Sequence, residues 1–119
     1  MSCRFLSRSR IKTQAEFQHI YQQAQRFVNR DKLAILANVN QLPYSRLGVV
    51  ITKRNIKKAV ARNQIKRIIR ESFRFRQDQL KHYDLVVVVY QGANTLTKKQ
   101  FYHCLAEQWD KVISEIQKC

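Results

Sequence analysis

Residues 46–76 read RLGVVITKRNIKKAVARNQIKRIIRESFRFR, and this stretch decides the fold. Its first part, residues 47–52, is a short aliphatic run of strand length, and residues 58–76 follow with the spacing of a long helix. Downstream, residues 84–90 (DLVVVVY) form a β-branched run that is too short for a helix and apolar enough for a buried central strand. A strand, a helix and a second strand in this order predict a parallel crossover within one mixed sheet.

The remaining segments add two helices and one further strand. A capping box at residues 13–16 (TQAE) opens a helix that runs to about Arg26, and a second one at residues 97–100 (TKKQ) opens a C-terminal helix. Residues 32–39 are aliphatic, and we expect them to pair with residues 47–52 as an antiparallel hairpin. The expected order is αββαβα, an α/β fold of the α+β type. It forms a single domain over residues 13–119, preceded by a basic flexible arm at residues 1–12.

Charge is the most unusual property of the chain. Its 119 residues carry 23 lysines and arginines against eight acidic residues, a formal charge of +15, while the hydrophobic fraction of 45% is that of an ordinary globular protein. The excess lies in residues 1–76, because residues 78–119 hold five basic and five acidic side chains. A localised excess of this size causes self-repulsion unless a polyanion lies beside it, so nucleic acid is the expected partner.

Cysteine usage and hydropathy indicate where the protein works. Cys3, Cys104 and Cys119 form no CxxC pair, and an odd cysteine count without a signal peptide predicts no disulfide framework. The longest apolar run, residues 85–90, has the length of a strand and falls far short of the roughly 18–20 residues that span a membrane. We therefore expect a soluble, cytoplasmic protein with no membrane partner.

The long helix and the loop before it concentrate the positive charge. Ten basic residues lie between positions 53 and 76, and only Glu71 opposes them. On a helical projection the cations cover one half of the circumference. The other half carries Ala61, Ile65, Ile68, Ser72 and Phe75. Like charges four residues apart repel, so an ordinary solvated helix would interleave glutamates. A membrane-surface or calmodulin-type helix is an alternative, but this apolar face is modest and is needed by the sheet. Phosphate contacts to RNA or DNA fit the pattern best.

A resemblance sharpens this hypothesis. Residues 46–54 (RLGVVITKR) and 59–74 (AVARNQIKRIIRESFR) closely resemble the protein subunit of bacterial ribonuclease P. Phe17 and Tyr21 in the first helix and the strand that begins at Asp84 extend the likeness over most of the chain. The resemblance implies a small α/β sandwich with a left-handed crossover, although the general chirality rule favours a right-handed one.

The resemblance also implies roles for individual residues. The basic helix would dock on the catalytic RNA subunit. The residues at the family's RNA-contacting motif are Arg62, Asn63, Lys66, Arg67 and Arg70, and Lys53, Arg54, Lys57, Lys58 and Arg74 are expected to extend that surface. Gln64 replaces the last arginine of the family's Arg-Asn-Arg motif, which removes one charge, and Tyr90-Gln91 stands where the family commonly carries a basic pair.

A cleft between the first helix and the sheet is implied as the binding site for the single-stranded 5′ leader of precursor tRNA. Phe17 and Tyr21 occupy the matching positions in this chain. Exposed aromatic rings stack on unpaired bases without demanding a particular sequence, which suits leaders that differ among tRNAs. Periodicity alone favours plain core packing for both side chains, because they lie on the apolar stripe of their helix.

No catalytic site belonging to the protein itself is predicted. The sequence has no HExxH or GxxxxGK[ST] motif, no metal-spaced Cys/His set and no paired carboxylates, and its three histidines are isolated. The resemblance implies an accessory subunit of an endoribonuclease, with one protein for each RNA and no cofactor on the protein. Hydrolysis and its Mg²⁺ ions would belong to the RNA subunit. The alternative class is a ribosomal-type structural RNA-binding protein without enzymatic context.

Overall fold

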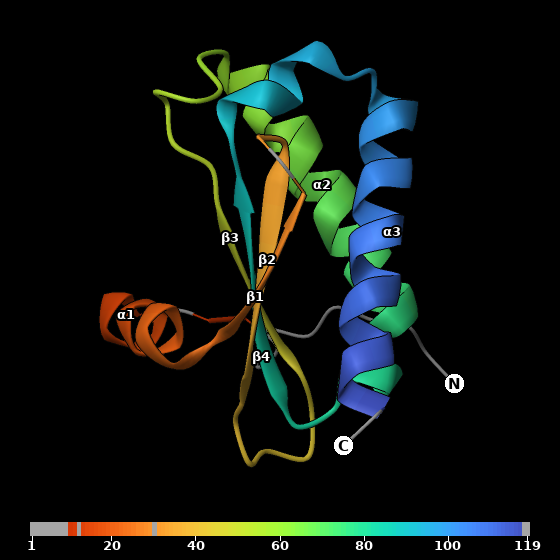
Figure 1. Cartoon of the computed structure of the whole chain (residues 1–119). Helices are drawn as coiled ribbons and strands as arrows, with labels where there is room; N and C mark the ends of the chain where they lie inside the picture. Colours follow the sequence, from red (N-terminus) through yellow and green to blue (C-terminus); the bar gives the residue numbers. More distant parts are fainter. Residues whose placement is uncertain (1–9, 12, 30, 118–119) are drawn as a thin grey trace.

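A computed structural model describes residues 10–11, 13–29 and 31–117 and shows a sheet that is covered by helices on both faces (Figure 1). Helix α1 (Gln14–Gln23) lies on one face, and α2 (Ala59–Arg76) and α3 (Lys98–Gln117) lie together on the other. The strands are β1 (Gln25–Asn29), β2 (Leu33–Val39), β3 (Arg46–Val50) and β4 (Tyr83–Val89), and the short 3-10 turns η2 (Gln77–Leu80) and η3 (Gln91–Thr95) flank β4. The predicted α+β class with a mixed central sheet is confirmed.

Strand β4 organises the sheet, whose strand order is β1-β2-β4-β3. It runs antiparallel to β2 and parallel to β3. Its side chains alternate between two cores: Leu85, Val87 and Val89 pack with α2 and α3, whereas Val86 and Val88 pack with α1. Because both faces of the strand are covered, both sets of side chains are apolar, as predicted for a buried central strand.

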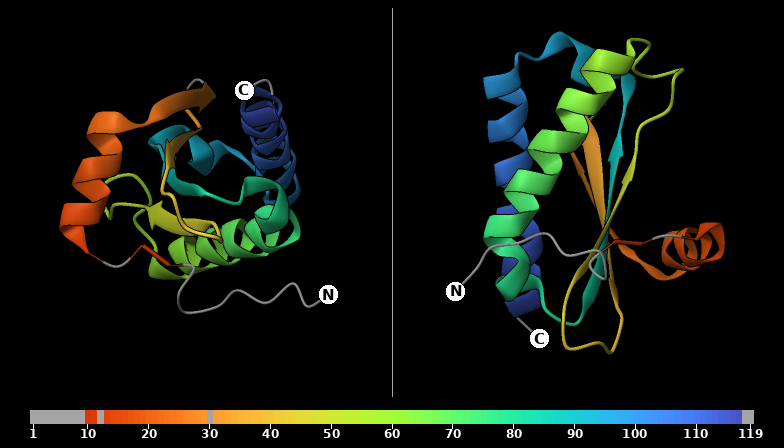
Figure 2. Two further views of the ribbon diagram at one scale, coloured as in Figure 1. Left: turned by 90° about the horizontal axis from the view of Figure 1, so that it is seen from below. Right: turned by 180° about the vertical axis from the view of Figure 1, so that it is seen from behind.

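The segment β3-α2-β4 is the predicted parallel crossover. Val49 of β3 lies opposite Val87 of β4, and Ile35 of β2 lies opposite Val87 on the other side. When the sheet is viewed with α2 in front and both strands running upward, β4 lies to the left of β3 (Figures 1 and 2). The crossover is therefore left-handed, as the resemblance implied and against the general chirality rule.

Both predicted capping boxes are present. At α1 the Glu16 amide donates to Thr13 Oγ1 (3.2 Å), and the Thr13 amide donates to Glu16 Oε1 (3.3 Å). At α3 the Gln100 amide donates to Thr97 Oγ1 (3.1 Å), and the Thr97 amide donates to Gln100 Oε1 (2.9 Å). Each box satisfies backbone donors that no helical carbonyl reaches, so the local sequence determines where these two helices begin.

The first helix is shorter than predicted and is followed by a strand. Helix α1 ends at Gln23 instead of near Arg26, because Ala24 is already extended with φ −78° and ψ 150°. Residues Gln25–Asn29 then pair antiparallel with β2 as an edge strand, so the observed order is αβββαβα and not αββαβα. Phe27 continues the helical spacing of α1 but packs against the core on the α3 side of the sheet.

Two further expectations are corrected. Residues 32–39 and 47–52 do not form a hairpin, because β4 lies between β2 and β3. The predicted flexible arm is not free along its whole length, because Ile11 is 6% exposed and its amide donates to the Leu47 carbonyl (3.0 Å). Residues 1–9 and 12 of that arm lie outside the described residues.

Helix α3 closes the larger core. Its buried residues are Phe101, Leu105, Gln108, Trp109, Val112 and Ile113. Trp109 packs against Phe73 of α2 with 6.1 Å between ring centroids, and Gln108 Nε2 donates to the Phe27 carbonyl of β1 (3.0 Å). Across the described ranges, no helix combines the length and the apolar character that a membrane span requires.

Candidate nucleic-acid interface

The loop between β3 and α2 presents four cations on an anchored backbone. The exposed cations are Lys53, Arg54, Lys57 and Lys58. Between them, Ile56 is buried in the core, and Asn55 Nδ2 donates to the Val89 carbonyl at the end of β4 (3.1 Å). The Ile56 amide also donates to the Thr52 carbonyl (3.0 Å). The loop is therefore held to the end of the sheet while its positive charges face solvent.

Helix α2 is rotated relative to the predicted apolar face. Its buried residues are Ile69, Ser72 and Phe73, which contact the core shared with α3. Phe75, which was expected on the apolar face, is 68% exposed. The centre of the buried face thus lies closer to the cationic half of the helix than the projection indicated, so several of the predicted RNA-binding cations are partly covered.

Arg62 is the cation most affected by this rotation. Its side chain is half-buried, and Nη1 donates to the carbonyls of Ile56 (2.7 Å) and Lys57 (2.8 Å). These backbone carbonyls carry no net charge, so they do not compensate the positive charge of the guanidinium. Arg62 therefore fixes the preceding loop to the first turn of α2, in addition to contributing positive charge to this surface.

The other α2 cations remain largely without internal counter-ions. The Arg67 side chain is 82% exposed, and its Nε lies 3.8 Å from Glu71 Oε1. Among ion pairs between described residues, this is the only one made by a basic residue of positions 53–76. Asn63 is exposed one turn before Arg67, and Lys66, Arg70 and Arg74 are half-buried. We call residues 53–74 with these side chains the cationic strip.

Phe17 and two residues of the cationic strip line one hollow of about 150 Å³. Phe17 comes from α1 and is half-buried, whereas Lys66 and Arg70 come from α2 on the opposite face of the sheet. The two helices reach the same hollow because β3, which lies between them, is the edge strand (Figure 2). Arg10, Ile11 and residues 47–49 complete the wall. The structure thus brings together a predicted leader-binding aromatic residue and predicted RNA-binding cations.

Gly48 allows the Phe17 ring to lie directly on β3. A Cβ atom at position 48 would lie 2.6 Å from Phe17 Cε1 and 2.7 Å from Phe17 Cζ, which is closer than van der Waals contact permits. The ring therefore depends on a residue without a side chain beneath it. This role of Gly48 is not visible in the sequence alone, since a glycine inside a predicted strand points only generally to a close approach.

Tyr21 lies on α1 outside the set of residues that line this hollow. It is half-buried, and burial raises its pKa above the ordinary value, with a smaller contribution in the same direction from Tyr90 and an opposing one from Arg26. Phe17 and Tyr21 both pack on the core between α1 and the sheet. The two predicted aromatic residues therefore share a face of α1. Of the two, Phe17 lines a hollow together with residues of the cationic strip, and Tyr21 does not.

Arg46 connects α1 to the sheet beside this hollow. Its Nε and Nη2 donate to the two carboxylate oxygens of Asp84 (2.8 and 2.6 Å), and its Nη1 donates to Glu16. Asn40 Nδ2 donates to the same Asp84 carboxylate (2.8 Å). The hydrogen bond from Arg46 holds the pKa of Glu16 below its ordinary value, and the hydrogen bond to Asp84 is the main cause that raises the pKa of Arg46.

This link went unnoticed in the sequence because its partners are far apart along the chain. Glu16 is next to Phe17, so the ion pair fixes the turn of α1 that carries the aromatic ring. Asp84 is 5% exposed, and its charge is compensated by Arg46. In the part of the chain that the structure describes, no three His, Cys, Asp or Glu side chains group together as metal ligands.

Comparisons with known proteins match both the sequence and the fold to one family. The family model described as Ribonuclease P matches residues 5–113. A "Ribonuclease P protein component" of Histophilus somni (strain 2336) is 38% identical over 109 residues, which cover 92% of this chain and 91% of the relative. The protein of the same name from Coxiella burnetii (strain Dugway 5J108-111) is also 38% identical over 109 residues, with 92% and 86% covered.

Solved structures extend the match to three dimensions. The structure of Staphylococcus aureus RNase P protein at 2.0 Å superposes with a TM-score of 0.81 at 30% identity, covering 87% of this chain and 94% of that one. The RNase P protein from Thermotoga maritima superposes with a TM-score of 0.66 at 25% identity, covering 82% and 96%. The range matched by the family model, residues 5–113, includes α1, the four strands and the cationic strip.

Proposed function

This chain belongs to the ribonuclease P protein family, and from that premise we propose two binding surfaces. The cationic strip binds the ribonuclease P RNA, and the hollow beside Phe17 binds the 5′ leader of precursor tRNA. The chain is the protein subunit of an endoribonuclease that processes tRNA, and its partner is the RNA of that enzyme. The ribosomal-type alternative is not favoured, because the relatives and the solved structures are ribonuclease P proteins.

The cationic strip is the surface that supports RNA docking. Among the described residues, the exposed Arg67–Glu71 contact is the only ion pair that this strip makes, so RNA phosphates are suited to act as its counter-ions. Phosphate contacts release condensed counter-ions, and each one steepens the fall of affinity with salt by about 0.7–0.9 in the log–log slope. Lys53, Arg54, Lys57 and Lys58 extend the surface around the start of α2.

The hollow beside Phe17 is the observation that carries leader binding. An unpaired strand needs an apolar surface for its bases and positive charge for its phosphates, and Phe17 lies in one wall with Lys66 and Arg70 in another. Stacking on an aromatic ring contributes about 1–3 kcal/mol per base without sequence preference. We assign Tyr21 to a contact with the same unpaired RNA strand, further along α1 and on the face that it shares with Phe17.

Hydrolysis is assigned to the RNA subunit together with Mg²⁺ ions that the RNA binds. Mg²⁺ held by the RNA would supply the activation of water and the stabilisation of the leaving oxygen, and this chemistry would need no side chain from the protein. The protein is assigned the binding of substrate and the relief of repulsion between two RNA molecules. We assign one protein to each RNA and one RNA-binding domain to residues 13–119. We also assign its action to the cytoplasm.

Reconstitution with a ribonuclease P RNA tests this function. Adding the protein should strengthen binding of a precursor tRNA much more than binding of the matching mature tRNA, which lacks the leader. The comparison should be repeated at several salt concentrations, because the docking contribution falls with salt. An equal effect on both tRNAs would contradict leader binding. Multiple-turnover cleavage by the protein without RNA would contradict the assignment of hydrolysis.

A further inference from the structure

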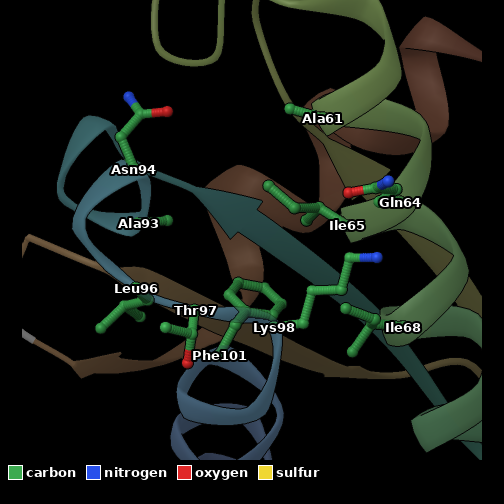
Figure 3. Close-up of a pocket in the computed structure, with 10 residues that line it drawn as sticks. All are labelled: Ala61, Gln64, Ile65, Ile68, Ala93, Asn94, Leu96, Thr97, Lys98 and Phe101. Atoms are coloured by element: carbon green, nitrogen blue, oxygen red, sulfur yellow. The ribbon is translucent and has the colours of Figure 1, made fainter.

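We propose that a second hollow, between the first half of α2 and the start of α3, receives an unstacked base of the ribonuclease P RNA. The inference rests on the proposed docking of α2 on that RNA. This hollow has a volume of about 130 Å³ and is separate from the one beside Phe17, with which it shares no lining residue (Figure 3). It extends the RNA-binding surface from α2 onto α3.

The floor of the hollow is apolar. Ile65 and Ile68 of α2 face Leu96 and Phe101 across it (Figure 3). Phe101 is 3% exposed and belongs to the core, whereas the other three side chains are only half-buried and keep part of their apolar surface in water. A flat apolar group inserted here would remove that surface from water, which is favourable by about 25 cal/mol for each Å².

The rim of the hollow carries two polar groups that are free to bind. Gln64 and Lys98 are exposed, and neither side chain has a polar partner among the described residues. The Lys98 side chain reaches from the first turn of α3 across the opening toward α2 (Figure 3). Asn94 and Thr97, by contrast, are already engaged, with the Asn55 carbonyl (2.7 Å) and with the Gln100 amide (3.1 Å).

These features select an RNA base as the occupant. A base has apolar faces and a hydrogen-bonding edge, which match the floor and the Gln64 amide, and the phosphate beside it matches the Lys98 ammonium. The residues that line the hollow include no acid, so an anionic ligand meets no repulsion. The α2 turns that form one wall also carry Asn63 and Arg67 of the cationic strip, so RNA docked there lies next to the opening.

Two substitutions and a matched control test the proposal in the reconstituted complex. Ala61→Leu places extra side-chain volume at the wall of the hollow, and its melting temperature shows whether the domain still folds. Lys98→Ala removes one charge from the first turn of α3. Lys99→Ala removes the same charge from the neighbouring exposed residue, which does not line the hollow. Each protein is titrated with ribonuclease P RNA at several salt concentrations, and base-specific chemical probing maps protected bases.

We expect Ala61→Leu to raise the dissociation constant for the RNA about tenfold and to expose one RNA base that the unmodified protein protects, since losing the burial of roughly 55 Å² of apolar surface has this magnitude. Lys98→Ala should lower the salt slope by about 0.7–0.9, and Lys99→Ala should lower it by less than half as much. Equal effects of the two lysines, or unchanged affinity and probing with folded Ala61→Leu, would overturn the proposal. Protection of a precursor tRNA base instead of a base in the RNA subunit would also overturn it. Arg67→Glu tests the docking of α2 separately. If this variant binds the RNA subunit more weakly, the docking holds even where the base-binding proposal fails.

Discussion

Replacing Arg46 with methionine tests how strongly the link between α1 and the sheet stabilises the domain. The guanidinium compensates the Asp84 carboxylate through two hydrogen bonds of 2.8 and 2.6 Å, and Asp84 is 5% exposed. Methionine keeps the apolar stem but leaves this buried charge with the Asn40 amide. Removing one partner of a buried ion pair costs about 3–5 kcal/mol. We expect about 3 kcal/mol in the free energy of unfolding, near the lower limit of that range, because the Arg46 side chain is 20% exposed and Asn40 still donates.

Urea unfolding followed by circular dichroism at pH 7 measures this loss. A change of about 3 kcal/mol lowers the ratio of folded to unfolded protein roughly 150-fold. Lys81→Met is the matched control, because Lys81 is exposed and its replacement should change stability by less than about 0.5 kcal/mol. Adding Asp84→Asn to Arg46→Met should recover more than half of the loss, since the uncompensated buried charge is then removed.

Two results would refute this reasoning. A loss below about 1 kcal/mol for Arg46→Met would place the ion pair among weak surface pairs, despite the burial of Asp84. A double variant no more stable than Arg46→Met alone would show that lost packing, and not the isolated carboxylate, is the cause of the destabilisation.

Further predictions concern the hollow beside Phe17, the cationic strip, and the ion pair between Arg46 and Glu16. Gly48→Ala should push the Phe17 ring off β3 and weaken precursor tRNA binding several-fold, with a smaller change for mature tRNA, measured by filter binding with the holoenzyme. Phe17→Ala should lower the free energy of unfolding by about 2 kcal/mol, because the ring is half-buried. It should also weaken precursor tRNA binding about tenfold. Loss of folding without loss of precursor discrimination in the folded fraction would favour a packing role alone. Arg67→Glu should raise the dissociation constant for the RNA subunit more than tenfold and leave the preference for precursor over mature tRNA intact, whereas unchanged assembly would exclude Arg67 from the interface. The pKa of Glu16 is lowered in the folded protein, mainly by the hydrogen bond from Arg46. The ionised carboxylate therefore contributes its full stabilisation at pH values above its ordinary pKa of 4.5, and this stabilisation is lost as the pH falls below that value. Glu16→Gln should remove this part of the acid sensitivity in urea titrations between pH 6 and 3.

Helix starts and the central strand were predictable because the interactions behind them are local. Thr13 and Thr97 each meet a partner three residues away, so a capping box identifies both helix starts. Burial on both faces leaves an uninterrupted apolar run for β4, which distinguishes it from a half-exposed strand. Strand β1 was missed because Phe27 keeps the helical spacing of α1 and because only pairing with β2 makes this segment a strand.

The candidate site was predictable only in part, for the same reason. The number of cations along residues 58–76 is visible in the sequence, whereas the rotation that exposes Phe75 and half-buries Arg62 depends on packing against α3 and the preceding loop. The hydrogen bonds between Arg46 and Asp84 join residues 38 positions apart. A contact at that separation leaves no periodic signal in a single sequence, and the ring of Phe17 over β3 is a contact of the same kind.

The docking of Ile11 against β3 covers part of one edge of the sheet. A strand with an open side presents amides and carbonyls that any extended chain can join, which leads to aggregation. Here the Leu47 carbonyl already accepts a hydrogen bond from the Ile11 amide, and the buried Ile11 side chain holds the incoming backbone in place. The segment that completes the wall of the hollow therefore also occupies part of the open side of β3, so removing residues 10 and 11 should favour aggregation as well as weaken binding at the hollow.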